Sequence, residues 1–360
     1  MNPIYIHSRK PDRDARDTPG SQTLTLGSLF DGSGGFPLGG LLCGITPVWA
    51  SEIEPFPIRV TTKRLPFMKH YGDVSRMDGG KIEPVDVITF GSPCQDMSIA
   101  GKRAGLDGSR SNLFYEAIRI VREMRCATDE KYPRYIVWEN VPGAFSSNKG
   151  ADFQSVLEEI CSVKGHEIHT PRPEKWPATG EIVADDFSLA WRVFDAQYWG
   201  VPQRRKRIYF VADFAGGSAG KILFESEGVS GYTPQGFRPW QGVAGAFAEG
   251  AGASGCVCLV RRLTPTECAR MQGFPDWWCA ELGTDEPTED EIEFWTEVFE
   301  AHRSAMGKSS RPKSRNQIIK WLKNPHSDSA EYKMWGNGVA LPNVYFVLSG
   351  IVYYARFSEG

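Results

Sequence analysis

The 360-residue chain lacks an apolar run long enough to cross a bilayer, and its polar first twenty residues do not form a signal peptide. It has only eight cysteines, without a CxxC pair, and its six histidines are scattered. These absences exclude a zinc-ribbon pattern and are typical of free thiols in a reducing cytoplasm. We therefore expect a flexible leader over residues 1–21 and a cytoplasmic protein with no bound metal and no membrane contact.

The chain also lacks a large excess of charge of either sign, since its formal net charge is −3. Basic residues nevertheless gather in the segments 203–207 and 303–323. An enzyme that acts on nucleic acid needs a local groove of positive charge but not a positive net charge over the whole chain. The two segments are therefore candidates for such a groove. Composition alone leaves open the alternative that both are ordinary solvated surface.

Apolar runs alternate with helical patterns along the first two thirds of the chain. Strands are predicted at 23–30, 47–52, 85–90, 134–138, 193–197 and 207–213, and helices at 113–125, 152–163, 281–300 and 342–356, with further helical spacing within 304–327. This alternation predicts an α/β fold with a doubly wound, mostly parallel sheet covered on both faces. We expect a catalytic domain over 22–213, a small target-recognition lobe over 214–334 and a C-terminal segment, 335–360, that returns to the catalytic domain.

A glycine-rich turn, residues 30–36, follows the first predicted strand. Glycines let the backbone approach a ligand closely, and the N-terminus of a helix follows the turn. Glu52 ends the next strand about twenty residues later, where a carboxylate accepts hydrogen bonds from ribose hydroxyls. This spacing predicts a nucleoside cofactor, but it does not separate NAD from S-adenosylmethionine.

Cys94 follows the third strand within Pro93-Cys94-Gln95 and opens a segment, 95–110, that is rich in glycine and basic residues. Positive charge favours the reactive thiolate, and such a segment is typical of a mobile lid that touches phosphate. The alternative is a buried, inert cysteine. The preceding proline and the polar segment that follows favour a nucleophile.

Glu139 ends the fourth strand, and we expect a carboxyl group at that depth to have a raised pKa and to donate a proton. The alternative is an acid that caps the next helix. Gln203-Arg204-Arg205-Lys206-Arg207 precedes the last strand, and its alternative is a basic surface turn.

Taken in order, these segments resemble the cytosine-C5 DNA methyltransferases of bacteria and phages. The resemblance covers residues 24–213, 261–277 and the C-terminal segment. It rests on the turn at 30–36, Glu52, Asp73, Pro93-Cys94-Gln95, Glu139-Asn140-Val141, residues 203–207, the Arg262 to Pro275 motif and Gly336-Asn337-x-Val339.

The resemblance implies methyl transfer from S-adenosylmethionine to C5 of a cytosine flipped out of double-stranded DNA. Cys94 would attack C6, Glu139 would protonate N3, Arg207 would hold O2, and Arg205 would support that site. The implied cofactor-binding residues are Phe30, Asp31, Gly32, Gly34, Gly35, Glu52, Ile53, Asp73, Val74, Gly91, Pro93, Leu113, Asn337 and Val339. The implied DNA-binding residues are Gln95, Ser98, Lys102, Arg103 and Arg110. The motif from Arg262 to Pro275 would be structural, with Arg270 and Gln272 as braces.

We expect a bacterial or phage-encoded monomer from a restriction-modification system or a phage's self-protection; a restriction endonuclease partner cannot be inferred.

The chain departs from this family between residues 214 and 260. This segment contains eleven glycines and lacks the varied polar and aromatic residues expected of a surface that reads DNA bases. An additional stretch, 278–332, carries a basic half. Either this stretch contacts phosphates, or the recognition element was lost by natural or engineered deletion; a helical hairpin that caps the small lobe is the structural alternative. The functional alternatives are a tRNA cytosine-C5 methyltransferase and a catalytically silent DNA-binding homologue.

Overall fold

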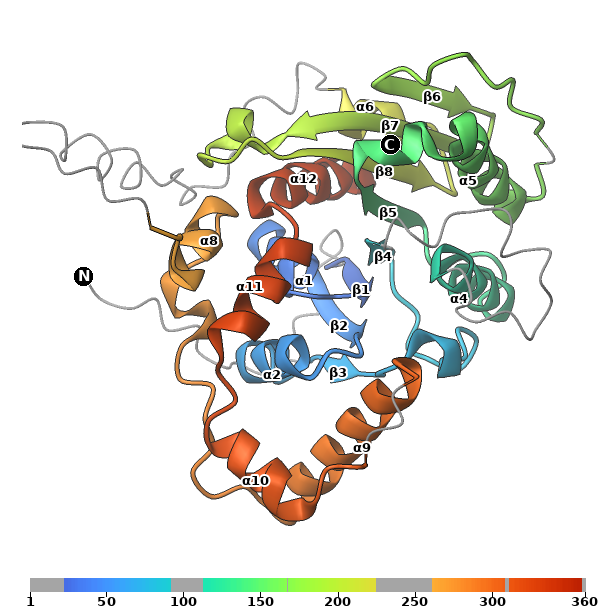
Figure 1. The fold of residues 1–360 in the computed structure, drawn as a ribbon. Coiled ribbons are helices and arrows are strands. Elements are labelled where there is room, and N and C mark those ends of the chain that lie inside the picture. The colour runs from blue at the N-terminus through green and yellow to red at the C-terminus, as the bar shows by residue number, and fades with distance from the viewer. Residues whose placement is uncertain (1–22, 92–112, 167, 225–260, 308–310, 358–360) are drawn as a thin grey trace, which may run out of the picture.

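The computed structural model describes residues 23–91, 113–166, 168–224, 261–307 and 311–357. Within these ranges eight strands form one sheet in the order β3-β2-β1-β4-β5-β8-β7-β6 (Figure 1). The strands are β1 (Thr25–Leu29), β2 (Thr46–Ser51), β3 (Lys69–His70), β4 (Val87–Phe90), β5 (Tyr135–Asn140), β6 (Thr179–Val183), β7 (Ser188–Asp195) and β8 (Lys206–Asp213). The α/β fold is confirmed.

The sheet is parallel from β3 to β5, whereas β5–β8, β8–β7 and β7–β6 pair antiparallel. The expectation of a mostly parallel sheet therefore holds only for its first five strands. The chain crosses from one side of β1 to the other between β2 and β4, so the carboxyl ends of β1 and β4 flank a topological switch point. Open α/β sheets bind ligands at such a point.

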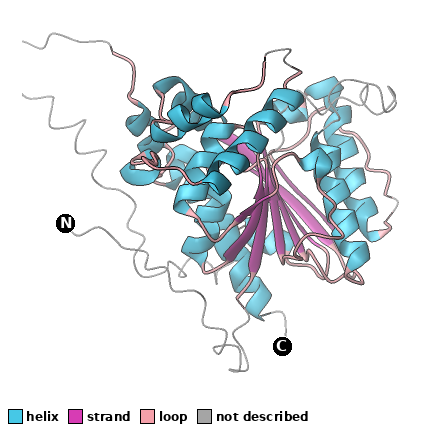
Figure 2. Cartoon of the chain, turned by 90° about the horizontal axis from the view of Figure 1, so that it is seen from below, coloured by secondary structure: helices cyan, strands magenta, loops and turns pink. Residues whose placement is uncertain are grey.

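Helices cover both faces of the sheet, as Figure 2 shows. One face packs against α1 (Gly35–Cys43), α6 (Ala219–Leu223) and α12 (Leu341–Phe357), and the other against α4 (Leu113–Ala127) and α5 (Ala151–Cys161). All side chains of β4 and β5 are buried, as central strands covered on both faces require.

The last helix, α12, packs against α1 near the other end of the chain. Cys43 Sγ lies 3.3 Å from Ser349 Oγ, 306 residues later. A Cβ added to Gly39 would lie 2.6 Å from Val344 Cγ1, so only glycine permits this approach.

Among the described residues no single helix is long and apolar enough to span a membrane, and α11 (Asp328–Asn337) and α12 meet those criteria only as a pair bent by 44°.

A second group of helices adjoins the β2–β3 end of the sheet. It contains α2 (Pro55–Arg64), α8 (Pro265–Met271), α11, α9 (Glu289–Ala305) and α10 (Arg315–Lys323). We call α9 and α10 with their connection the α9–α10 hairpin. Ile58 of α2 packs with Ile292, Trp295, Ile318 and Leu322 of the hairpin. The boundaries expected for the three domains stay a prediction.

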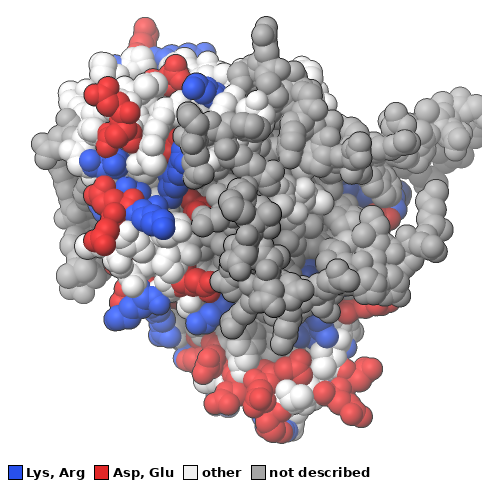
Figure 3. Space-filling model, turned by 180° about the vertical axis from the view of Figure 1, so that it is seen from behind, with Lys and Arg blue, Asp and Glu red and all other residues white. Residues whose placement is uncertain are grey.

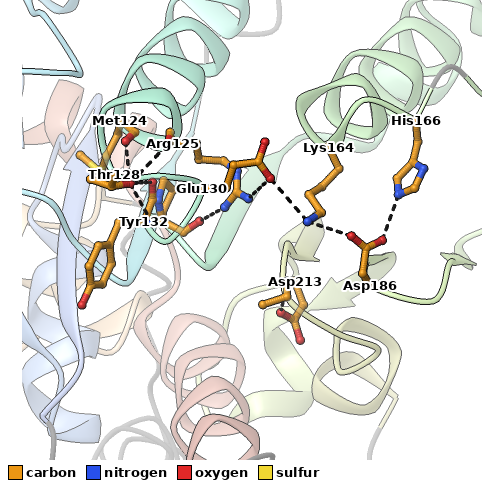
Figure 4. A network of polar contacts seen from close by, with 11 residues as sticks. Met124, Arg125, Thr128, Glu130, Tyr132, Lys164, His166, Asp186 and Asp213 are labelled. Atoms are coloured by element: carbon orange, nitrogen blue, oxygen red, sulfur yellow. Dashed lines mark hydrogen bonds and ion pairs between the residues drawn. The ribbon is translucent and has the colours of Figure 1, made fainter.

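Polar contacts tie the β6–β7 turn to the ends of α4 and α5 (Figure 4). Arg125 lies 3.3 Å from Glu130, and Lys164 bridges Glu130 and Asp186 at 3.6 and 2.9 Å. His166 lies 3.3 Å from Asp186. The cations of Arg125 and Lys164 are 4% and 14% exposed, whereas their partners Glu130 and Asp186 are exposed, so these contacts connect the surface turn to the ends of the two helices.

Candidate active site

The glycine-rich turn and Glu52 meet at the carboxyl ends of β1 and β2. The backbone enters the turn through Phe30 and Gly32, both at φ +55°, and the N–H of Gly32 donates to Glu52 Oε2 at 2.8 Å. A non-glycine residue in this left-handed region is strained, and such strain is concentrated at functional sites. This bond joins the glycine-rich turn to Glu52, twenty residues away in the sequence, and the two form one corner at the carboxyl ends of β1 and β2.

The three glycines of this turn have different structural roles. Among the described residues, a Cβ on Gly32 would meet only the backbone Phe30 O within 4 Å, at 3.8 Å, so no described side chain fills the space beside it. Gly34 has φ +76° and precedes α1. A Cβ on Gly35 would lie 2.3 Å from Val339 Cγ2. Gly35 is therefore required by packing, whereas Gly32 leaves room for a ligand.

Two carboxyl groups lie at this corner. Glu52 Oε1 accepts from the N–H groups of Ile53 and Glu54 at 2.8 and 2.9 Å, and burial raises the pKa of Glu52. Asp31 is 5% exposed; Ser28 Oγ donates to its Oδ1 at 2.7 Å, and its Oδ2 has no hydrogen-bond partner among the described residues. Burial raises the pKa of Asp31 to about 8, and the charge of Glu52 adds to that effect.

Asp73 and Val74 lie in the turn after β3. Ser51 Oγ donates to Gly72 O at 2.7 Å and so holds this turn beside the end of β2. Asp73 Oδ1 accepts from the N–H and Oγ of Ser75 at 2.9 and 2.8 Å, which caps the turn. The side chain of Val74 is buried in the main core. Leu113 begins α4 half-buried, and Asn337 is exposed at the end of α11.

Glu139 lies within β5, next to the ends of β4 and β8. Arg207 Nε is 3.0 Å from Glu139 Oε1, and a Cβ on Gly91 would lie 3.5 Å from Oε2. Glu139 is 7% exposed. Burial raises its pKa, and the positive charges of Arg207 and Arg205 oppose that rise. Glu139 caps no helix, since the 3-10 turn that follows has Val141 at its N-cap position without a side-chain bond. The site thus holds a buried acid beside a guanidinium.

Arg205 links this acid site to the C-terminal segment. It donates to Gly336 O at 3.4 Å and to Gly338 O. Arg205 lies immediately before β8, and Arg207 is the second residue of that strand. The structure therefore brings the 203–207 segment beside the Gly336-Asn337-x-Val339 segment.

Two buried polar groups at the site, Ser33 and Tyr209, were not assigned roles from the sequence. A Cβ on Gly338 would lie 2.9 Å from both Ser33 Oγ and Gln272 Oε1, and neither oxygen has a hydrogen-bond partner in the described ranges. Tyr209 pairs in register with Glu139, and its buried hydroxyl is also unpartnered there. The position of Ser33 in the glycine-rich turn was the only sequence feature that pointed to it.

Gln272 does hold the C-terminal segment, which is consistent with a bracing role. Its side-chain Nε2 donates to Trp335 O, and its backbone carbonyl oxygen accepts from the N–H of Leu341 at 2.8 Å. Arg270 instead pairs with Asp276 at 2.6 Å within its own motif. The two bonds of Gln272 join the Arg262 to Pro275 motif to the junction of α11 and α12.

Several predicted site residues lie outside the described residues, namely Pro93, Cys94, Gln95, Ser98, Lys102, Arg103 and Arg110. Gly91 is described and lies three residues before Cys94. Over the described part of the chain, no group of three or more His, Cys, Asp or Glu side chains is placed to hold a metal ion.

Three cations of the basic half of the α9–α10 hairpin make contacts within the hairpin. Arg315 pairs with Glu289, Arg303 pairs with Glu300, and Lys313 Nζ lies 5.0 Å from the centre of the Phe299 ring. Acidic side chains gather at the lower end of the molecule in Figure 3, where the hairpin lies in Figure 1. The hairpin packs against α2, which favours the structural alternative over a phosphate-binding arm.

Comparisons with known proteins place this geometry in a family. The chain is 33% identical over 258 residues to a protein of Escherichia phage P1 named DNA N-6-adenine-methyltransferase, covering 64% of this chain and 34% of that protein. It is 30% identical over 162 residues to the type II methyltransferase M.NgoBV of Neisseria gonorrhoeae, covering 45% and 33%. The chain thus spans about a third of the length of these relatives.

A crystal structure of the Dnmt2 methyltransferase of S. pombe shares the fold, with a TM-score of 0.52 at 18% identity over 93% of this chain and all of that one. The family model for C-5 cytosine-specific DNA methylases matches residues 24–215, which include the glycine-rich turn, Glu52, Glu139 and Arg207. The protein therefore belongs to the C-5 cytosine-specific DNA methylase family.

Proposed function

We propose that this protein transfers a methyl group from S-adenosylmethionine to C5 of a cytosine flipped out of double-stranded DNA, through a covalent adduct with Cys94. The observation that carries the proposal is the buried Glu139 carboxyl group between Arg207 and Gly91. Cys94 follows Gly91 by three residues, a span of about 10 Å at most for an extended chain. This short connection sets an upper limit on the distance between Cys94 and the Glu139 site.

The residues at the corner of β1 and β2 fit an adenosine cofactor with a cationic end. No described side chain fills the space beside Gly32, and Glu52 Oε2 accepts one described hydrogen bond, so a second lone pair remains for a ribose hydroxyl. Asp31 Oδ2, which has no hydrogen-bond partner among the described residues, supplies a carboxyl oxygen for the cationic end. Asp73, Leu113, Asn337 and Val339 would complete the adenine end. S-adenosylmethionine, when bound, supplies an electrophilic methyl group.

The protein's side chains make C5 nucleophilic. The Cys94 thiolate adds to C6, the electron pair of the C5–C6 double bond shifts to C4–C5, and the C4–N3 double-bond pair moves onto N3, which leaves an enamine with a nucleophilic C5. Glu139 donates a proton to N3, so negative charge does not build up on the ring. Arg207 would hold O2 of the base and, with Arg205, balance the charge that Glu139 acquires. After C5 gains the methyl group, water accepts the C5 proton, the electron pair of that C–H bond re-forms the C5–C6 double bond, and the C6–S pair leaves with sulfur as the Cys94 thiolate. N3 returns its proton to Glu139.

The test is methyl transfer from tritiated S-adenosylmethionine to mixed-sequence duplex DNA and, separately, to tRNA, with Cys94→Ala as the control. The labelled nucleoside is then identified by chromatography. We expect 5-methylcytosine in DNA, and we expect the label to disappear with Cys94→Ala. Sequencing of the product would give the target site.

Other outcomes identify the alternatives. Label in tRNA alone would favour an RNA methyltransferase. Labelled N6-methyladenine would overturn the proposal and match the name of the phage P1 relative. No label in either substrate, together with retained DNA binding, would favour a silent DNA-binding homologue.

A further inference from the structure

Glu54 joins three elements that are far apart in the sequence. It lies two residues after Glu52 and immediately before α2. Lys333 Nζ of α11 donates to Glu54 Oε1 at 2.7 Å, and His302 Nε2 of α9 lies 3.5 Å from the same oxygen. The side chains of Glu54 and His302 are 28% and 19% exposed, whereas that of Lys333 is 54% exposed, so the cluster lies at the edge of the α2–α9–α11 contact. His302, foremost, and Lys333 lower the pKa of Glu54 to about 2.

Glu54 is rigidly connected to Glu52. Its own N–H donates to Glu52 Oε1, the oxygen that also accepts from Ile53, while Oε2 accepts from Gly32. A displacement of the Glu54 backbone therefore moves the carboxylate proposed to bind ribose. It also alters the bond that orients the glycine-rich turn.

Lys333 is similarly connected to the other wall of the site. It lies on α11 one turn before Asn337, and Arg205 donates to the backbone on either side of Asn337, at Gly336 O and Gly338 O. Glu54 thus anchors α11 from the cofactor side, and Arg205 anchors it from the target side. Asn337 lies between the two anchors.

The α9–α10 hairpin reaches the same point through His302, and Arg59 of α2 fixes its base. Arg59 Nε donates to Leu282 O at 2.8 Å, and its guanidinium carbon lies 5.7 Å from the centre of the Trp295 ring. The position of His302 at the end of α9 is therefore determined by a docked element rather than a free helix.

We propose that Glu54, Lys333 and His302 are positioning residues that hold α11 and the α9–α10 hairpin against the Glu52 turn and so set the geometry of the nucleoside end of the cofactor site. This proposal rests on the proposed function. It gives the additional stretch at 278–332 a role in cofactor binding rather than in reading DNA.

The test is calorimetric titration of the full chain with S-adenosylmethionine and with 5′-methylthioadenosine, which lacks the amino-acid end. We expect Glu54→Gln to weaken both ligands about tenfold and Lys333→Met to weaken both about threefold, with Lys333→Arg restoring the affinity. Lys320→Met, an exposed lysine of α10, is the matched control and should bind as the unchanged protein does. At saturating cofactor, kcat of Glu54→Gln should stay within about twofold.

The outcomes separate this inference from the proposed function. If the unchanged protein binds neither ligand, the proposed function fails and this inference fails with it. If it binds both ligands, and folded Glu54→Gln and Lys333→Met bind them equally well, the positioning role is overturned while the proposed function stands. A lower melting temperature with unchanged dissociation constants would likewise overturn the inference, because it would show a purely structural role.

Discussion

Arg207 and Glu139 face each other across the antiparallel pair β5 and β8, with Nε 3.0 Å from Oε1. The arginine comes from the first antiparallel strand of the sheet and the acid from the last parallel one. Burial favours the protonated form of Glu139, while the guanidinium stabilises the carboxylate that remains after proton donation.

Glu139→Gln keeps the shape of this side chain but removes its acidic proton. We expect kcat for methyl transfer to fall by about 10² or more, the usual range for loss of a general acid. The dissociation constant of S-adenosylmethionine should be unchanged. Glu297→Gln, on the exposed face of α9, is the control; equal activities of the two variants in a steady-state assay would contradict the role of Glu139.

Gly35→Ala places a methyl group 2.3 Å from Val339 Cγ2 and 3.3 Å from Phe274 Cζ. We expect the free energy of unfolding to fall by about 1–3 kcal/mol, as for other overpacked cores. Gly217→Ala, at a position with no atom within 4 Å of the added Cβ, should be nearly neutral. Urea unfolding of both variants tests this, and equal midpoints would show that α1 shifts to accommodate the methyl group.

Asp31 should make the cofactor-free protein less stable as the pH rises. Its pKa is raised to about 8 in the folded state, whereas an unfolded aspartate titrates near 4. Between these values the folded state binds the extra proton, so the free energy of unfolding falls from pH 4 to pH 8 and then levels off. The loss should be on the order of a few kcal/mol.

The variant Asp31→Asn isolates this effect. Asparagine keeps an oxygen that can accept from Ser28 but cannot ionise, so the unfolding free energy should depend less on pH over this window. Parallel pH series by urea unfolding provide the measurement. Identical slopes in the two proteins would mean that Asp31 is ionised in the folded state.

Lys313→Ala together with Arg315→Ala should leave the salt dependence of DNA binding unchanged, because Arg315 pairs with Glu289 and Lys313 lies over Phe299. Each lost phosphate contact would instead reduce the slope of log K against log salt by about 0.9. Lys102→Ala, in the segment predicted to touch phosphate, provides the comparison. A flatter slope for the double variant would restore the phosphate-binding hypothesis.

Most of the central sheet could be predicted because its strands are continuous apolar runs that end in polar residues. The pair β7 and β8 was recognised, but β7 begins at Ser188, five residues before the prediction, and a 3-10 turn occupies 196–199. The buried Ser188-Leu189-Ala190-Trp191 lacks the β-branched residues that favour strands. The short β3 and the edge strand β6 were missed because neither carries an apolar run.

The start of helix α9 shows how an N-cap determines the residue at which a helix begins. The acidic, apolar pattern predicted a helix from residue 281, yet α9 begins at Glu289 after a capping box between Thr288 and Glu291. The link between the glycine-rich turn and Glu52 followed from their spacing. The contact between Glu54 and Lys333 could not, because 279 residues separate them and no local pattern records the pairing.

The contact between α1 and α12 also has a consequence for synthesis. Cys43 emerges early, but its neighbour Ser349 follows 306 residues later. At roughly 5–20 residues per second, the apolar face of α1 stays without its final cover for about 15–60 s. Until then the nascent chain presents that face to solvent or to a chaperone, so emergence of α12, rather than emergence of the first strands, marks the moment when the sheet can be closed on both sides.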